Sequence, residues 1–177
     1  AEAYDDWFES LKSEYQPVPE IRYGLEGEES VYLPAHEARF SGDIHFMEGH
    51  GWAHDWLVNW INKKDSIVWE VVVDQPTAYD VVLAYSCPAE NVGSTLRINT
   101  AVSSSESAIL KAHNPDYLPS PDRIQRIEVY EKEWGRLDLG EITVLPGVQE
   151  ITLKALDIPA GQVGEIKGLH LSPKQTE

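Results

Sequence analysis

Residues 67–85 read IVWEVVVDQPTAYDVVLAY, and this stretch decides the fold class. Large apolar side chains recur at every second position through Ile67–Val73 and again through Tyr79–Tyr85, which is the period of a half-buried β-strand. The residues between them, Asp74 to Thr77, contain a proline and indicate a turn. We therefore predict two strands that pair as a hairpin with a short connection.

Further short strands, separated by turns rich in proline, glycine and asparagine, extend this pattern along the chain. Many short strands with no helices between them predict an all-β, antiparallel β-sandwich of the jelly-roll type. The other expected strands are Val31–Phe40, Thr95–Thr100, Ser107–Ala112, Ile124–Tyr130, Gly140–Leu145, Gln149–Leu156 and Glu165–Leu171.

The N-terminal residues follow a different period. Aromatic residues and a leucine recur at helical spacing, which predicts a short helix over residues 1–14. An acidic, glycine-containing connector follows it. The expected division is an N-terminal helix and connector at 1–30, a β-sandwich at 31–173 and a tail at 174–177.

The composition excludes several classes of protein. Thirty acidic residues against fourteen lysines and arginines give a net charge of −16, which repels a phosphate backbone and argues against nucleic-acid binding. The apolar runs are strand-sized, so no membrane span is expected. Cys87 is the single cysteine, which excludes an internal disulfide, and we expect it to have a packing role. Six tryptophans and eight tyrosines against three phenylalanines are typical of wet recognition surfaces.

The segment Gly49–Ile61, GHGWAHDWLVNWI, places a tryptophan at every fourth position. Two interpretations remain open: a stripe packed on the core, or a loop that holds rings and polar groups around a ligand. We expect Trp60 in the core, and Trp52 and Trp56 nearer the surface. The His50–His54 spacing can chelate zinc on a helix, but the neighbouring glycines disfavour a helix, so no metal site is predicted.

The order of these motifs along the chain resembles the order found in a known family. The first strand ends in Ser41-Gly42 and the aromatic segment follows; then come WEVVV, GSTLRI, WGRLDLG and, near the end, IKGLHLSP. Over residues 31–173 this order resembles the galactose-binding-like β-sandwich of carbohydrate-binding modules in families six and thirty-five. It also resembles modules appended to secreted sulfatases and fucosidases.

The resemblance implies a non-catalytic module that binds a polysaccharide or oligosaccharide in a loop-built cleft. It implies a catalytic domain in the same parent protein, which the module targets to its substrate, a secreted or cell-surface location and no cofactor. Indole rings suit the apolar face of a pyranose, and polar side chains suit its hydroxyl rim. The family asparagine before the last strand is replaced here by a glutamate. The expected sugar-binding residues are Trp52, His54, Asp55, Trp56, Trp134, Arg136 and Glu165.

Related modules hold a structural calcium through carboxylates in the first and last strands. The matching positions here are Pro34, His36 and Lys167. These side chains supply no anionic oxygen, so the resemblance predicts that this calcium is absent, with a positive charge from Lys167 in its place.

Other interpretations stay open. A local basic cluster, Arg123, Arg126, Lys132 and Arg136, either receives a sulfate or uronate or offsets neighbouring glutamates. The chain is alternatively a structural sandwich that packs on a catalytic domain without binding sugar. A jelly-roll polysaccharide lyase would use a histidine and a tyrosine such as His113 and Tyr117. Because no catalytic signature surrounds the acidic residues, we expect no enzyme activity.

Overall fold

The computed structural model describes residues 23–25, 29–119 and 130–174. The helix predicted over residues 1–14 lies outside these ranges, as do residues 124–129 of the predicted strand Ile124–Tyr130.

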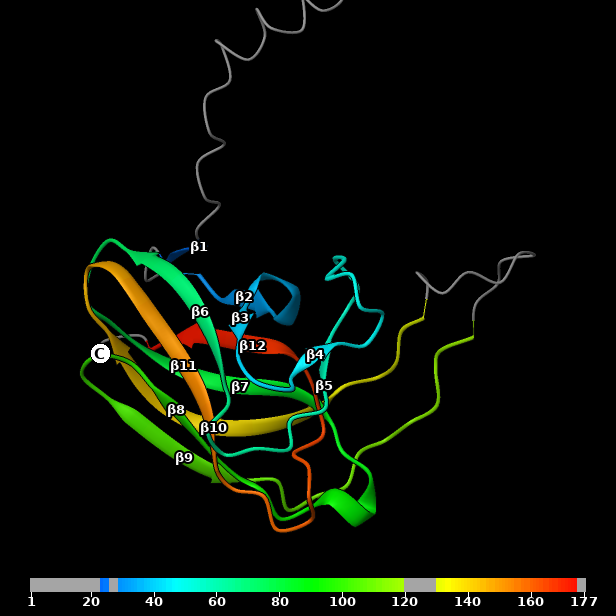
Figure 1. Cartoon of the computed structure of the whole chain (residues 1–177). Coiled ribbons are helices and arrows are strands. Elements are labelled where there is room, and N and C mark those ends of the chain that lie inside the picture. The colour runs from blue at the N-terminus through cyan, green and yellow to red at the C-terminus, as the bar shows by residue number, and fades with distance from the viewer. Residues whose placement is uncertain (1–22, 26–28, 120–129, 175–177) are drawn as a thin grey trace, which may run out of the picture.

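Within the described residues, two six-stranded β-sheets pack face to face (Figure 1). Sheet A comprises β1 (Tyr23–Leu25), β3 (Arg39–Phe40), β6 (Ser66–Val73), β8 (Thr95–Asn99), β9 (Ser104–Ala108) and β11 (Gly147–Asp157). Sheet B comprises β2 (Val31–Pro34), β4 (His45–Phe46), β5 (Leu57–Val58), β7 (Thr77–Ser86), β10 (Gly135–Val144) and β12 (Glu165–Pro173). Two short 3-10 turns, η1 (Ala35–Glu37) and η2 (Ala89–Asn91), complete the described elements.

The strand order in sheet A is β1-β6-β11-β8-β9, with β3 also beside β6; in sheet B it is β10-β7-β12-β5-β4, with β2 beside β12. The β1–β6 pair is parallel and the other strand pairs are antiparallel. The predicted all-β, antiparallel sandwich is therefore confirmed. Among the described residues, none forms a helix with the length and apolar character that a membrane span requires.

The predicted hairpin is wrong. Strand β6 pairs with β11 in sheet A, whereas β7 pairs with β10 and β12 in sheet B, so the turn at residues 74–76 crosses from one sheet to the other. Strand β6 and the first half of β7 each have one buried face, and these faces meet across the core, whereas Leu83–Ser86 at the end of β7 are buried on both faces. An alternating pattern fixes which residues of a strand are buried, but it does not identify the neighbouring strand.

Several strand boundaries also differ from the prediction. The expected strand Val31–Phe40 is broken by η1, and its two ends join different sheets as β2 and β3. Strand β9 ends at Ala108, and β10 begins five residues before the expected Gly140. Strand β1 pairs with β6 from within the predicted connector, so sheet A begins before residue 31.

The core is a single cluster of buried side chains from both sheets. Strand β6 shows the alternation of buried and exposed positions most clearly: Ile67, Trp69, Val71 and Val73 are buried, and the residues between them are partly exposed. The indole nitrogen of Trp69 donates to the carbonyl oxygen of Pro34 at 2.9 Å, which satisfies its polar atom inside the core. Burial of these side chains is the main source of stability.

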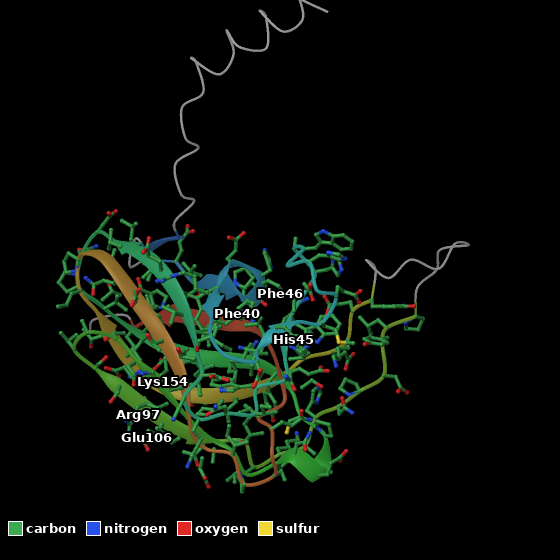
Figure 2. The ribbon with its side chains drawn as sticks, viewed as in Figure 1. Phe40, His45, Phe46, Arg97, Glu106 and Lys154 are labelled. Carbon is green, nitrogen blue, oxygen red and sulfur yellow. The ribbon has the colours of Figure 1, made fainter. Side chains whose placement is uncertain are left out.

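The loop between β4 and β5 and the segments that lead to residue 119 and from residue 130 project from one end of the sandwich, away from the C-terminus (Figure 1). We call this end the loop end. The Phe40 and Phe46 rings meet edge to face there, with centroids 5.0 Å apart, and so connect β3 of sheet A with β4 of sheet B (Figure 2). The outer face of sheet A carries charged residues such as Arg97, Glu106 and Lys154 (Figure 2).

Candidate functional site

The β4–β5 loop is organised by the carboxylate of Asp55. Its Oδ1 accepts hydrogen bonds from the backbone N–H groups of Glu48 and Trp56, at 3.1 and 2.9 Å, and its Oδ2 accepts one from Gly51 at 3.1 Å. Asp55 is fully buried. Asp55 therefore lies inside the loop and not at an exposed rim, and both of its oxygens accept hydrogen bonds from the loop backbone.

The three tryptophans of this region have different environments. Trp60 is buried in the core, as predicted. Trp56 is also fully buried, which corrects the expectation that it lies near the surface, whereas Trp52 is 43% exposed. The ring of Trp52 stacks on that of His50, with centroids 4.6 Å apart. The segment is thus neither a core stripe nor a fully exposed aromatic loop, because its first rings, His50 and Trp52, are exposed and its later rings, Trp56 and Trp60, are buried.

Trp56 and Trp134 form the centre of a compact group at the loop end. Their rings are 5.3 Å apart in an edge-to-face arrangement, and Tyr117 lies 6.3 Å from Trp56. The ammonium of Lys132 is 5.3 to 5.7 Å from the centroids of all three rings. Such distances favour cation–π attraction. We call these rings, together with Lys132, Lys167, Glu131 and Glu165, the lysine–aromatic cluster.

Two ion pairs close this cluster. Lys132, only 5% exposed, pairs with Glu165, and its ammonium also lies 3.4 Å from the hydroxyl oxygen of Ser86. Lys167 pairs with Glu131 at 3.0 Å. A lysine this deeply buried needs both a carboxylate and favourable ring contacts to offset its loss of hydration. Lys132 of the predicted basic cluster therefore pairs with Glu165 and not with a glutamate next to it in the sequence, and Arg123 and Arg126 of that cluster lie outside the described residues.

The carboxylate of Glu131 is held in its charged form. Burial by itself would raise its pKa. Hydrogen bonds from the backbone N–H of Lys132, the indole of Trp134 and the ammonium of Lys167 outweigh that effect and hold the pKa of Glu131 below its usual range. The indole bond is short, with Trp134 Nε1 at 2.6 Å from Glu131 Oε1. This charge fixes the orientation of the half-buried Trp134 ring.

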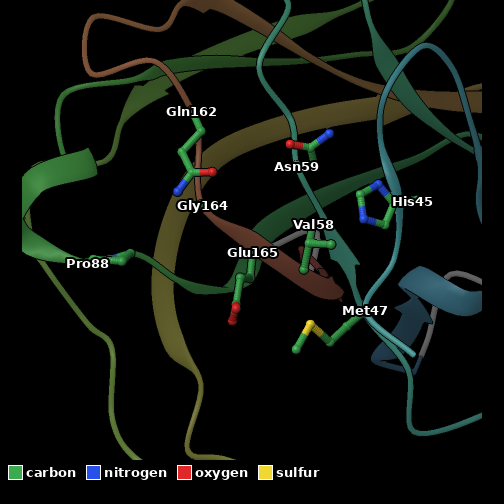
Figure 3. Close-up of a pocket in the computed structure, with 8 residues that line it drawn as sticks. All are labelled: His45, Met47, Val58, Asn59, Pro88, Gln162, Gly164 and Glu165. Carbon is green, nitrogen blue, oxygen red and sulfur yellow. The ribbon is translucent and has the colours of Figure 1, made fainter. Parts of the chain in front are cut away.

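An open hollow lies beside the cluster (Figure 3). Its volume is about 310 Å³, near the lower end of the range of roughly 300–1,000 Å³ for small-ligand sites. In Figure 3, residues of β4, β5 and Asn59 face those of the segment before β12 across it. The lining residues are His45, Met47, Val58, Asn59, Pro88, Gln162, Gly164 and Glu165.

The hollow combines polar and apolar groups. The imidazole Nδ1 of His45 and the amide nitrogen of Asn59 both donate to the carbonyl oxygen of Asp43, at 2.9 and 3.0 Å, which fixes the orientation of these two side chains. Gln162 and Glu165 supply polar groups on the opposite side, and Met47 supplies apolar surface. Amide, imidazole and carboxylate groups around apolar surface suit a ligand that carries hydroxyl groups on an apolar ring.

The structure brings some of the predicted sugar-binding residues together and separates others. Trp56, Trp134 and Glu165 belong to one cluster, and the carbonyl oxygen of His54 accepts from Lys167 there. The Nε2 atom of His54 is buried and has no hydrogen-bond partner within the described residues. Arg136 is exposed on β10, where its charge acts on His170: burial first, and then this charge, lower the pKa of that imidazole.

The residues considered for other chemistry have structural contacts. His113 lies 2.9 Å through Nε2 from the carbonyl oxygen of Glu133, and the ring of Tyr117 stacks on Tyr130 at 5.0 Å. Cys87 is buried as predicted, and burial raises the pKa of its thiol, an effect to which the charge of Glu90 adds. Residues 23–25, 29–119 and 130–174 contain no group of three metal-ligating side chains that could hold an ion.

Sequence reasoning missed most of the hollow. Met47 and Asn59 each follow the end of a short strand, and Gln162 lies in the turn before β12. Asn59 belongs to the aromatic segment 49–61, but none of the three was predicted to contact a ligand. Asn59 adopts a left-handed backbone conformation with φ 60°, which asparagine tolerates better than most residues. Of the lining residues, Glu165 was identified from the sequence, through its position before the last strand.

The comparisons with known proteins agree on the architecture. No protein-family model matches this sequence, and no curated protein matches it. A native family 35 carbohydrate binding module from Clostridium thermocellum superimposes with a TM-score of 0.55 at 12% identity, over 81% of this chain and 97% of the module. The chain has the β-sandwich fold of a family 35 carbohydrate-binding module. The likeness predicted from the order of the strands is confirmed for the fold.

This sandwich also occurs within longer proteins. The Podospora anserina GH26-CBM35 β-(1,4)-mannanase matches with a TM-score of 0.57 at 12% identity, over 84% of this chain. The mosquito-larvicidal Cry4Aa toxin from Bacillus thuringiensis matches with a TM-score of 0.61 at 13% identity, over 88% of this chain. The chain spans only 28% and 25% of the lengths of these two proteins. Identities this low establish the fold and not the ligand.

Proposed function

We propose that this chain is a non-catalytic carbohydrate-binding module that holds a polysaccharide or oligosaccharide at the loop end of sheet B. The observation that carries the proposal is the open hollow beside the lysine–aromatic cluster, with Glu165 shared by both. The hollow provides hydroxyl-binding groups, and the half-buried Trp134 and the exposed Trp52 provide rings on the same end. The buried ring of Trp56 packs edge to face against Trp134 and supports it, rather than contacting sugar.

In this proposal the module acts through its covalent link to a catalytic domain. A module linked to a catalytic domain in the same secreted or cell-surface protein raises the concentration of substrate near that domain's active site without chemistry of its own. The family 35 module in the name of the matching mannanase supports this arrangement. Single-site affinity is expected to be roughly micromolar to millimolar, because a shallow, wet site gains little over the cost of association.

Affinity electrophoresis in gels that contain neutral, uronic or sulfated polysaccharides tests the proposal. We expect retardation of the wild type by at least one polysaccharide. Trp134→Ala and Gln162→Ala should each weaken it by about tenfold or more, because each removes a direct ligand contact. Val148→Ala is the matched control, because Val148 is 51% exposed on sheet A, away from the loop end. Equal retention of all four proteins, each folded by circular dichroism, would contradict the assigned site.

A second candidate is a structural sandwich that packs on a catalytic domain and binds no sugar. The burial of Trp56 and the filling of the space between the rings by Lys132 and Lys167 favour it. A folded wild-type protein that no polysaccharide in the panel retards would support this function instead. The lyase alternative is tested by ultraviolet absorbance of an unsaturated uronate product, which we do not expect from any polysaccharide.

A further inference from the structure

Lys167 connects parts of the loop end that are distant in sequence. Its ammonium donates to the carbonyl oxygen of His54 at 2.5 Å and to Oε2 of Glu131 at 3.0 Å. It also lies 5.4 and 5.5 Å from the ring centroids of Trp56 and Trp134. The contacts join β12 to the β4–β5 loop, 113 residues earlier, and to the segment before β10, 36 residues earlier.

The two oxygen contacts are of the kind that a small structural cation makes, and the two ring contacts suit an ammonium. A carbonyl oxygen, a carboxylate oxygen and two ring faces converge on one positive charge, which is 12% exposed on its side chain. Because the charge is covalently attached to a strand of the sandwich, it is present whenever the chain is folded. It needs no ion from solution, and its N–H groups donate to the carbonyl oxygen of His54 and to Oε2 of Glu131, which are oxygens of the kind that a metal would coordinate.

The calcium site that the fold resemblance implies does not fit these residues. The carbonyl oxygen of Pro34 accepts from the indole of Trp69, and the imidazole of His36 lies 3.6 Å from the carboxylate of Glu37. The third position is Lys167 itself, which brings a positive charge. Calcium needs six to eight oxygen ligands, so this donor set disfavours it.

We propose that Lys167 is a positioning residue whose ammonium fixes the loop end of the sandwich in place of a bound metal ion, so that the order of the β4–β5 loop is independent of calcium. The ammonium holds the loop through His54, holds Glu131 and thereby orients the ring of Trp134. Saccharide binding is not required for this role.

Hydrogen exchange followed by mass spectrometry tests the proposal on the wild-type chain and on Lys167→Met. Methionine keeps an unbranched side chain of similar length and removes the charge. We expect the backbone amides of Met47, Gly51 and Trp56, which are hydrogen-bonded within the loop, to exchange about tenfold faster in the variant. A factor of about this size corresponds to the loss of one hydrogen bond to a charged group. The amides of β6 should be unaffected.

Lys174→Met is the matched control, since Lys174 pairs with Glu141 and Asp80 on the surface; it should leave loop exchange unchanged. Unchanged loop exchange in Lys167→Met would overturn the proposal. A second arm needs no variant: exchange and Tm of the wild type should be equal in excess EDTA and in millimolar calcium. A calcium-dependent change in either would equally overturn it. Because these readouts do not involve sugar, a failure here is distinct from a failure of the proposed function.

Discussion

Asp55 illustrates how a polar residue in a recognition-like segment can be structural. Its side chain accepts three backbone hydrogen bonds and is shielded from solvent. Its position between His54 and Trp56 in the chain gave no sign of this, because a sequence of rings and polar groups is equally typical of a ligand-binding rim. The difference arises from the loop path, which folds the N–H groups of residues 48 and 51 back onto the carboxylate.

We predict that Asp55→Ala destabilises the fold by about 2–4 kcal/mol, because it leaves several backbone N–H groups without their acceptor. Urea denaturation followed by tryptophan fluorescence measures this. The matched control is Asp116→Ala, an exposed aspartate at the same end of the sandwich, for which a change near zero is expected. Equal stabilities of the two variants would show that the loop does not depend on the carboxylate.

Glycines 161 and 164 both lie in the turn that leads into β12, but only Gly164 is close to another strand. Both have positive φ, at 91° and 119°. A Cβ at Gly164 would lie 2.6 Å from the carbonyl oxygen of Ser86 at the end of β7, whereas a Cβ at Gly161 would meet nothing within 4 Å. The close approach at Gly164 brings β12 against β7 and shapes one side of the hollow.

Gly164→Ala should therefore cost more stability than Gly161→Ala. The strained backbone conformation alone accounts for roughly 1–3 kcal/mol in either variant, and the contact with Ser86 adds to it only at position 164. Thermal unfolding of both variants measures the difference. If Gly161→Ala were as destabilising as Gly164→Ala, the close approach of β12 to β7 would not contribute to the cost of the substitution at Gly164.

At the scale of the whole molecule, the net charge of −16 opposes compaction. Sodium chloride screens repulsion between surface carboxylates, so we expect Tm at pH 7 to rise with salt, by roughly 2–4 °C for each kcal/mol gained. Near the pI of about 4.6 the same addition of salt should change Tm less. Differential scanning calorimetry at the two pH values provides the measurement, and a Tm at pH 7 that falls with salt would contradict this account.

The strands, and the alternation of buried and exposed side chains within them, could be predicted from the sequence because they depend on neighbours along the chain. In β6, Ile67, Trp69, Val71 and Val73 alternate with less buried residues, and any sheet with one buried face requires that pattern. The order of the motifs also indicated the sandwich. It placed Trp134 and Glu165 in the same region, and both lie in the lysine–aromatic cluster.

Pairing, burial of loop rings and the hollow depended on contacts between distant parts of the chain. Strands β6 and β7 have the pattern of a hairpin but belong to different sheets, since alternation does not specify a partner. Trp56 is buried because Trp134, Lys132 and Lys167 cover it, and each of these is more than seventy positions away in the sequence. Such neighbours come together only when the sheets pack, so local periodicity carries no information about them.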